Sequence, residues 1–448
     1  MTSLTTPDSG SSLAALLDDS PFVSYSYSYP HKSAYRPFRE PVPLREVWGA
    51  ENRRSLFLYL HVPFCEYRCG FCNLFTQSNP AADLPAAYLR MLRRQAERVR
   101  GQLGEAAFAR LAIGGGTPTF LDCAELEDLF AICVDVMGAA PRRIPVSLEA
   151  SPATVDRDKL ALLREFGVDR LSIGIQTFDD AESKKLGRPQ KRSESVRALA
   201  AIREAGFPTL NIDLIYGGET QTVASWLQSV RTALEYRPEE LYLYPLYVRP
   251  LTGVGRLRRE WDDLRLAMCR EARQLLLDTG YAQISFRMFR APHAPADDGP
   301  VYCCQEDGMV GLGCGARSYT AGLHYSTEYA VGQSGVRSIL AAYLNRDDAW
   351  FDAAHYGDRL PIDDQRRRHV IMSLLQHTGL SRTDYADRFG ADPFAHLSEL
   401  SELEPLGLAE VTAERIRLTA AGIERSDTIG PWLYSNRVRR RTESSGCR

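Results

Sequence analysis

The sequence predicts an α/β protein, with a partial, TIM-like (β/α)6 barrel followed by a C-terminal, mostly helical, winged-helix-like domain. Two observations carry this prediction. Between residues 56 and 247, six short β-rich runs alternate with segments of helical period, which is the pattern of parallel βαβ units. From residue 361 to about residue 427, helical segments are followed by two strand-like runs around a turn. Right-handed crossovers curl the first region toward a barrel, whose functional loops lie at the carboxyl ends of the strands.

The expected elements follow in chain order. The clearest helix covers residues 84–103, where Pro85 suits the first turn and Tyr88, Leu92 and Val99 share one face. The six barrel strands are expected at residues 57–62, 110–113, 145–150, 169–175, 209–215 and 240–247. Beyond them we expect a helix at 262–278, a strand-like stretch at 281–289, a helix at 363–375, and short strands at 408–412 and 415–418.

Composition divides the 448-residue chain into four parts. Residues 1–50 form an N-terminal tail, rich in Ser and Thr and expected to be disordered to about Leu17, and an aromatic and basic arm. This arm, residues 25–38, is either surface packing or a lid over an active site. Residues 51–290 form the barrel, 291–360 complete it and link onward, and 361–448 form the end domain with a basic tail. We expect the tail arginines to be solvated; they are Arg437, Arg439, Arg440 and Arg441.

Charge and hydropathy give no reason to expect a nucleic-acid or membrane partner. The net charge is −3, hydrophobic residues make up 44% of the chain, and no run of about 18 apolar residues occurs. No basic segment followed by an apolar one opens the chain, so we expect a cytoplasmic protein. A winged helix can bind DNA, but no segment here combines Arg and Asn with a basic face, which favours a packing or lid module.

Three cysteines directly after the first strand carry the strongest functional signal. They are spaced Cys65-x3-Cys69-x2-Cys72. Iron–sulfur clusters are held by thiolates, usually four, so a cubane on these three keeps one iron open to chemistry. Alternatives are a structural zinc site, which needs a fourth ligand, or buried thiols.

A glycine-rich loop and three polar residues follow the later strands. Gly114-Gly115-Gly116-Thr117 lets the backbone approach a ligand closely, and it lacks the lysine of a nucleotide P-loop. Glu149, Gln176 and Asp213 each end an otherwise apolar strand. In a barrel these groups converge on one mouth, although each alone is also compatible with a structural polar residue.

With these motifs in place, the chain resembles the radical S-adenosylmethionine (SAM) superfamily. More closely, it resembles the oxygen-independent coproporphyrinogen III dehydrogenase family. It also resembles an uncharacterised bacterial subfamily of that family. The motifs that carry the family resemblance are Tyr59 to Cys65, Gly114 to Thr119, Leu171 to Phe178, Asn211 to Gly217 and Gly311 to Ala316.

The resemblance implies a [4Fe-4S] cluster on Cys65, Cys69 and Cys72, whose open iron chelates SAM. One electron, supplied by a partner such as flavodoxin or ferredoxin, then cleaves SAM to a 5′-deoxyadenosyl radical that acts on a small-molecule substrate. A monomer is implied. The positions that would hold this SAM are Tyr59, Phe71, Gly115 and Glu149. Family members also hold a second SAM, at positions that match Gly116, Thr117, Gln176, Arg188 and Asp213.

Departures from the family pattern bear on the reaction. Asn73 follows Cys72, where coproporphyrinogen dehydrogenases carry a further cysteine, and Cys303-Cys304-Gln305 stands where heme-chaperone relatives have a His-Asn segment. The favoured hypothesis is therefore methyl or methylene transfer, of the class C type, or C–H oxidation. The alternatives are coproporphyrinogen III decarboxylation and a non-catalytic heme or iron–sulfur trafficking role.

Several further residues are open to two interpretations. Five of the side chains either face the substrate or are ordinary core aromatics and surface cations; they are Tyr244, Tyr247, Arg249, Arg256 and Arg317. Cys303, Cys304 and Cys314 are either radical-relay thiols or buried neighbours.

Overall fold

The computed structural model describes residues 12–249, 251–257, 259–296 and 303–444. A 13-stranded sheet has the order β1-β15-β14-β13-β12-β2-β5-β6-β7-β8-β9-β11-β10. At its centre six neighbouring strands pair in parallel. They are β2 (Leu56–Val62), β5 (Phe108–Gly115), β6 (Val146–Ala150), β7 (Arg170–Gln176), β8 (Thr209–Tyr216) and β9 (Glu240–Pro245). The six predicted strands are confirmed, and the described strands form an open arc rather than a closed barrel.

Shorter strands extend both edges of the parallel core. On one side β12 (Met309–Leu312) pairs in parallel with β2, and the strands beyond it are antiparallel. These are β13 (Arg317–Tyr319), β14 (Leu323–Ser326), β15 (Ala353–Arg359) and β1 (Arg36–Pro43). On the other side the predicted stretch 281–289 is split into β10 (Ala282–Gln283) and β11 (Met288–Arg290). Two further short strands, β3 (Phe64–Cys65) and β4 (Gln77–Ser78), pair beside the cysteine loop.

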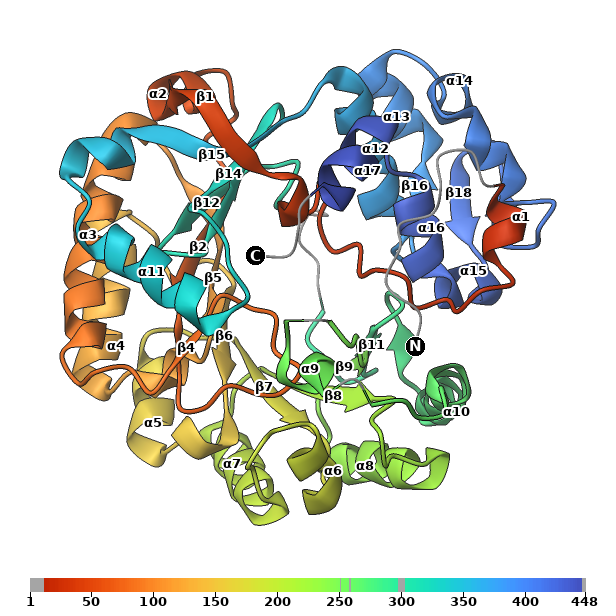
Figure 1. Cartoon of the computed structure of the whole chain (residues 1–448), viewed down its shortest axis with the longest axis horizontal. Helices are drawn as coiled ribbons and strands as arrows, with labels where there is room; N and C mark the ends of the chain where they lie inside the picture. The colour runs from red at the N-terminus through yellow and green to blue at the C-terminus, as the bar shows by residue number, and fades with distance from the viewer. Residues whose placement is uncertain (1–11, 250, 258, 297–302, 445–448) are drawn as a thin grey trace.

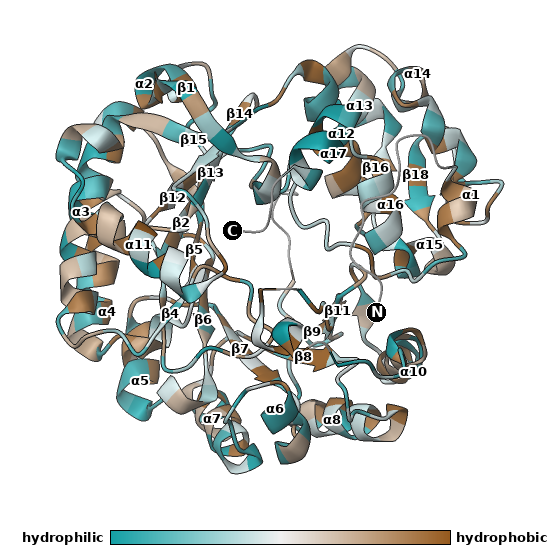
Figure 2. Ribbon diagram, in the orientation of Figure 1, coloured by the Kyte–Doolittle hydropathy of each residue, from teal (hydrophilic) through white to brown (hydrophobic). Residues whose placement is uncertain are grey.

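Helices cover the outer side of the arc, as Figure 1 shows for α3, α4, α5, α7 and α8. The strands are apolar because both of their faces are covered: helices pack on the outer face, and the inner face lines the interior of the arc. In Figure 2 brown apolar segments mark β7 and β8, whereas α5 and α6 are largely polar. The helices of this region are α2 (Leu44–Gly49), α3 (Leu84–Leu103), α4 (Cys123–Ala131), α5 (Arg157–Glu165), α6 (Asp180–Lys185), α7 (Arg192–Ala205), α8 (Val223–Glu235), α9 (Gly253–Arg256), α10 (Arg265–Asp278) and α11 (Gln333–Leu344).

Short helical turns complete this region: 3-10 turns η1 (Lys32–Ala34), η2 (Pro118–Phe120), η4 (Pro152–Thr154) and η5 (Asp348–Asp352), and a π turn η3 (Ile132–Val136). None of the helices in the described part of the chain combines the length and the hydropathy that crossing a membrane requires.

The C-terminal region is a helical group with a small sheet, at the upper right of Figure 1. The three strands pair antiparallel in the order β16-β18-β17. This arrangement agrees with the predicted mostly helical, winged-helix-like architecture. The elements are α12 (Ile362–Leu374), β16 (Leu380–Ser381), α13 (Arg382–Phe389), α14 (Pro393–His396), η6 (Ser398–Glu402), β17 (Ala409–Val411), β18 (Arg415–Leu418), α15 (Ala420–Glu424), α16 (Ser426–Trp432) and α17 (Asn436–Glu443).

Two predictions about the chain ends are wrong. The first is disorder up to Leu17: residues 13–16 form a short helix, α1 (Leu13–Leu16), and Leu13 is fully buried, while residues 1–11 lie outside the described residues. The second is a solvated basic tail. Arg437 pairs with the buried carboxylates of Asp358 and Asp364, at 2.8 and 2.6 Å. Arg439 is also buried, and it donates to the carbonyls of Tyr434 and Trp432, whereas Arg440 is exposed as predicted.

The same network fixes the aromatic arm. The Tyr29 hydroxyl donates to the Asp364 carboxylate at 2.5 Å, and Ser435 donates to the same carboxylate at 2.7 Å. Arg441 donates to the carbonyl of Ala34 at 3.0 Å. The arm is therefore held from behind by α12 and α17.

Candidate active site

The three cysteines lie in the loop that follows β2, and each sulfur has a hydrogen-bonding partner. Thr117 Oγ1 donates to Cys65 Sγ at 3.6 Å, and Arg188 Nη1 donates to Cys69 Sγ at 3.2 Å. Cys72 Sγ lies 3.9 Å from Thr76 Oγ1. All three thiols stay partly accessible. The loop thus offers three supported sulfur donors with room for a ligand.

Burial governs the acidity of two of these thiols. It raises the pKa of Cys65 to about 12, and it also raises the pKa of Cys69 against the opposing effect of Arg188. Both are therefore protonated at neutral pH in the metal-free chain, and cluster binding must displace these protons.

Backbone contacts to two other loops hold the cysteine loop in place. Gly70 N donates to Leu186 O at 2.9 Å, and Val254 N donates to Gly70 O at 2.8 Å. A Cβ on Gly70 would lie 2.7 Å from Leu186 O, and one on Gly253 would lie 3.1 Å from Gly70 Cα. Only residues without side chains permit this approach. A Cβ on Gly187 would likewise lie 2.9 Å from Gly70 N. We call this contact of Gly70, Gly187 and Gly253 the glycine junction; no sequence motif predicted it.

Within the described residues, no group of three or more His, Cys, Asp or Glu side chains converges closely enough to hold a single metal ion. This gives no support to the zinc alternative. A four-iron cubane is larger than one ion and takes its thiolates at separate irons. Sulfur donors spread along one loop suit that group.

The residues assigned to the first SAM come together at the ends of β2, β5 and β6. Gly115 N donates to Glu149 Oε2 at 3.0 Å, and a Cβ on Gly114 would lie 2.8 Å from the Glu149 carboxyl carbon. Glu149 is solvent-accessible, yet surrounding protein raises the pKa of its carboxyl to about 7 by desolvation. Tyr59 OH lies 3.2 Å from Nδ1 of His61. Glu149 therefore faces an interior space that a ligand can reach.

Phe71 lies in the cysteine loop and Gly116 lies beside it. Phe71 packs against Leu186 and Leu246, next to the glycine junction. A Cβ on Gly116 would lie 3.0 Å from Cys65 Sγ, so this position keeps the sulfur accessible only as glycine.

Two of the residues assigned to a second SAM lie on neighbouring strands: Gln176 ends β7, and Asp213 lies within β8 opposite Gly174. Gln176 has a left-handed backbone, φ 71°, and its buried Oε1 has no hydrogen-bond partner within the described part of the chain. Asp213 accepts from Asn211 at 2.7 Å, and burial raises the pKa of its carboxyl to about 6. Backbone strain and an unsatisfied buried acceptor are typical of ligand sites. These residues fit a polar ligand.

Arg188 connects this group to the cluster loop. Besides Cys69, its guanidinium donates to Gly174 O at 2.6 Å and to Gln190 Oε1 at 2.7 Å. An arginine has five N–H donors, so two remain for a carboxylate. Its contact with a cluster sulfur was not part of the sequence-based assignment.

Comparison with known proteins decides the family. The Radical SAM superfamily model matches residues 59–233, and the HemN C-terminal domain model matches residues 360–424. The chain superposes on coproporphyrinogen III oxidase (HemN) from Escherichia coli with a TM-score of 0.77 at 25% identity, covering 93% of this chain and 98% of that one. The chain fits a HemN-like family of radical SAM proteins.

Curated members of the HemN-like family match over most of their length. Oxygen-independent coproporphyrinogen III oxidase of Pseudomonas aeruginosa is 28% identical over 434 residues, 90% of each chain. Heme chaperone HemW of Bacillus subtilis is 26% identical over 374 residues, 81% of this chain and 95% of that one. Membership of the radical SAM superfamily brings a [4Fe-4S] cluster and SAM as cofactors, together with a small-molecule substrate and a reductant.

The arm is the part of the site that sequence motifs located least well. Gln305 accepts from Tyr29 N at 3.0 Å and donates to Tyr27 O at 3.1 Å, and Arg317 donates to Tyr27 OH at 3.1 Å. The arm therefore packs inside the molecule. It carries His31 and Lys32, part of the run Tyr29-Pro30-His31-Lys32 that the resemblance to the bacterial subfamily includes.

Several open assignments can now be placed. Tyr247 joins Asp427 and Arg287, whose ion pair measures 2.6 Å with both side chains buried, so Tyr247 belongs to the contact between barrel and end domain. Tyr244 stacks edge-on against Tyr25 of the arm. Cys314 is fully buried, whereas Cys303 and Cys304 remain partly accessible.

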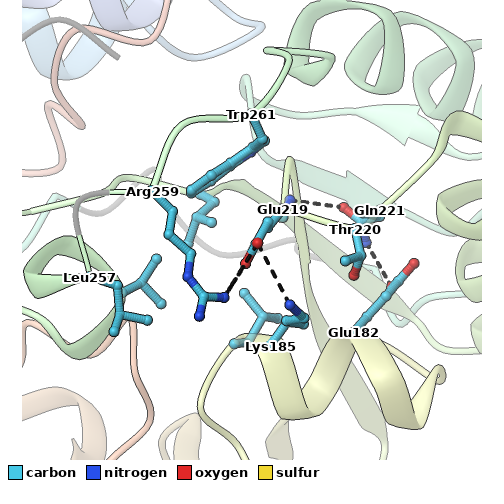
Figure 3. A pocket seen from close by; sticks show the side chains of 12 residues that line it. Glu182, Lys185, Glu219, Thr220, Gln221, Leu257, Arg259 and Trp261 are labelled. Carbon is cyan, nitrogen blue, oxygen red and sulfur yellow. Dashed lines mark hydrogen bonds and ion pairs between the residues drawn. The ribbon is translucent and has the colours of Figure 1, made fainter.

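A small pocket lies beside the glycine junction (Figure 3). Glu219 pairs there with Arg259 at 3.1 Å and with Lys185 at 3.6 Å, and Trp261 forms one wall. The lining includes Leu186 and Val254, whose backbones bond to Gly70. The residues that line this pocket include none of those assigned to SAM.

Proposed function

We propose that this radical SAM enzyme binds two SAM molecules and uses them for methyl or methylene transfer, or for C–H oxidation, on a small-molecule substrate. The observation that carries the proposal is the second polar group, in which Gln176 Oε1 is buried without a partner beside Asp213. Glu149, assigned to the first SAM, lies on a different strand, β6. We propose that a SAM bound at Glu149 does not also pair with Gln176 and Asp213, which would then bind a second one.

The chain's own residues would prepare the first SAM. Cys65, Cys69 and Cys72 would hold the cluster, which when bound supplies the electron that cleaves the sulfonium of SAM to a 5′-deoxyadenosyl radical. Donors on the cysteine sulfurs stabilise the thiolates, because a hydrogen bond to the charged form favours it. Glu149 would orient the SAM amino group through the carboxylate oxygen that Gly115 leaves free.

The second SAM would lie between Gln176, Asp213 and Arg188, with Gly116 and Thr117 closing the space from the loop after β5. The two remaining N–H groups of Arg188 would bind its carboxylate. Asp213, with a pKa of about 6, is ionised at neutral pH and would accept from a ribose hydroxyl or an amino group.

Two alternatives keep specific support. Coproporphyrinogen III decarboxylation is supported by the relatives from Pseudomonas aeruginosa and Escherichia coli, which are oxygen-independent coproporphyrinogen III oxidases, but Asn73 departs from the pattern of that enzyme. A heme or iron–sulfur trafficking role is supported by the heme chaperone relative. We favour a cytoplasmic location, since exposed thiolates and clusters persist in reducing compartments.

The test is the number of SAM molecules bound. Equilibrium dialysis of the anaerobically reconstituted chain should give two SAM per chain, and D213N or Q176A should lower the value to one. D278N, which changes an exposed carboxylate at the end of α10, is the matched control. One SAM per chain in the wild type at saturation would contradict the proposal. Loss of carbon dioxide from added coproporphyrinogen III would instead establish the first alternative.

A further inference from the structure

Three cations from distant segments meet in the site without a carboxylate partner. Lys32 comes from the arm, Arg249 from the loop after β9, and Arg317 from β13. Lys32 Nζ lies 3.4 Å from the ring centroid of Tyr329, and Arg317 donates to the hydroxyl of Tyr27 and lies over its ring. In the part of the chain that the structure describes, the buried Nε of Arg249 has no hydrogen-bond partner. Within the described residues, none of the three forms an ion pair.

The three charges act on one another. Burial lowers the pKa of Lys32 well below its usual range, and the positive charges of Arg317 and Arg249 lower it further. The groups that act most strongly on Arg317 are tyrosines, namely Tyr27, Tyr319, Tyr35 and Tyr59. Like charges that are enclosed without a counterion are costly, so a bound anion would stabilise this arrangement.

Their position places that anion next to the chemistry. The Tyr329 hydroxyl, under Lys32, donates to the carbonyl of Asn73, the residue after the last cluster cysteine. Lys32 and Arg317 both act on His61, whose ring occupies the space beside Gly115. The cations therefore border the cluster loop at Asn73, one residue after Cys72.

The arm holds Lys32 in a defined place. His31 Nδ1 lies 2.8 Å from Ser33 Oγ, and its Nε2 lies 3.3 Å from Tyr27 OH. Tyr29 is anchored by Asp364 and Gln305. A lysine on a solvated surface would instead sample many rotamers at little cost.

We infer that Lys32, Arg249 and Arg317 form an anion site that binds a carboxylate or phosphate group of the substrate. This inference rests on the proposed function, because it places an anionic group of the substrate beside the cysteine loop and the proposed SAM sites. The competing explanation is that the cations only balance the negative charge of the cluster thiolates.

The test uses thermal unfolding of the full, anaerobically reconstituted, SAM-saturated chain. Succinate and inorganic phosphate are the probes, each compared with sodium chloride at equal ionic strength. Wild type should show a saturable rise in Tm, because an anion that binds only the native state stabilises it. The larger of the two responses identifies carboxylate or phosphate. In K32M, R249M and R317M, the half-saturating concentration should rise at least about tenfold.

Matched variants make the result decisive. R157M removes a cation from an exposed pair on α5 and should respond like wild type. K32R and R317K keep the charge and should restore the response if a methionine variant unfolds. An equal response in wild type and in the three variants would overturn the inference, as would no response in wild type. A response that vanishes on cluster loading would assign the cations to the cluster. None of these outcomes depends on SAM cleavage, which is tested separately.

Discussion

The cluster loop and the aromatic arm lie at the same site, but they differ in how fully their polar groups are paired within the protein. In the cluster loop every cysteine sulfur has a hydrogen-bond partner and the backbone is locked at the glycine junction. The arm is anchored from behind by Asp364 and Gln305, yet its Lys32 acts on Arg249 and Arg317 with no carboxylate paired to any of the three within the described residues. The cysteine loop is thus fixed by contacts within the protein, whereas the cations beside the arm lack a protein counterion there.

The largest effect is expected at the glycine junction. In G70A the new Cβ would lie 2.7 Å from the Leu186 carbonyl, which is backbone and has little freedom to move. The loop must shift, and a displacement of about 1 Å costs about 100-fold in rate. We therefore expect SAM cleavage to fall about 100-fold and bound iron to decrease. G101A, at a helix position with open space, is the control and should cleave SAM normally.

G70A protein that keeps its iron and cleaves SAM within twofold of wild type would show that the junction does not position the loop. The cluster side would then be no more rigid than the arm.

The next effect concerns the anchor of the arm. R437M leaves the carboxylates of Asp358 and Asp364 buried without their main partner, with side chains 1% and 3% exposed. Removing one partner of a buried pair costs about 3–5 kcal/mol. Chemical denaturation should show this loss, and proteolysis within residues 25–38 should accelerate. R157M, in an exposed pair, should cost at most about 1 kcal/mol.

If R437M leaves the arm as protected from protease as in wild type, α17 is not its anchor. Unchanged SAM binding in R437M would show that the anchoring of the arm does not affect the cofactor site, which is the difference between arm and cluster loop that we describe.

The smallest effect is a pH dependence on the cofactor side. Burial raises the pKa of Glu149 to about 7, above its value in the unfolded chain. Between about pH 4.5 and 7 the native state therefore holds more protons, and its stability falls as pH rises. The glutamine of E149Q does not titrate. In the SAM-free chain, the Tm of E149Q minus the Tm of wild type should therefore increase from pH 5 to pH 8. E127Q, on exposed α4, should show no such trend.

A constant Tm difference between E149Q and wild type across this pH range would mean that the Glu149 carboxyl is not desolvated. The interior space beside Gly115 would then be more open than the structure indicates.

Local sequence patterns predicted much of the fold and of the cofactor side. Apolar runs located the six parallel strands, and the polar Glu149 near the end of β6 contacts Gly115 at the end of β5, as the barrel rule suggests. The strand β12 was missed because its four residues include Gly311, which weakens any strand signal.

Features made by tertiary contact left no local signal. The glycine junction depends on Leu186 and Val254 approaching Gly70, and these residues are more than 100 positions away in the chain. The tail arginines read as solvated because the carboxylates that bury Arg437 lie about 70 to 80 residues upstream. The arm has no helical or strand period, since single contacts such as Tyr29 with Asp364 fix it.

The most direct measurement is 5′-deoxyadenosine formation by the anaerobically reconstituted chain with SAM and a reductant. The account predicts steady release of 5′-deoxyadenosine by wild type and none by variants in which Cys65, Cys69 and Cys72 are each changed to Ala. An absence of 5′-deoxyadenosine in iron-loaded wild type, or an undiminished yield in the cysteine variants, would contradict it.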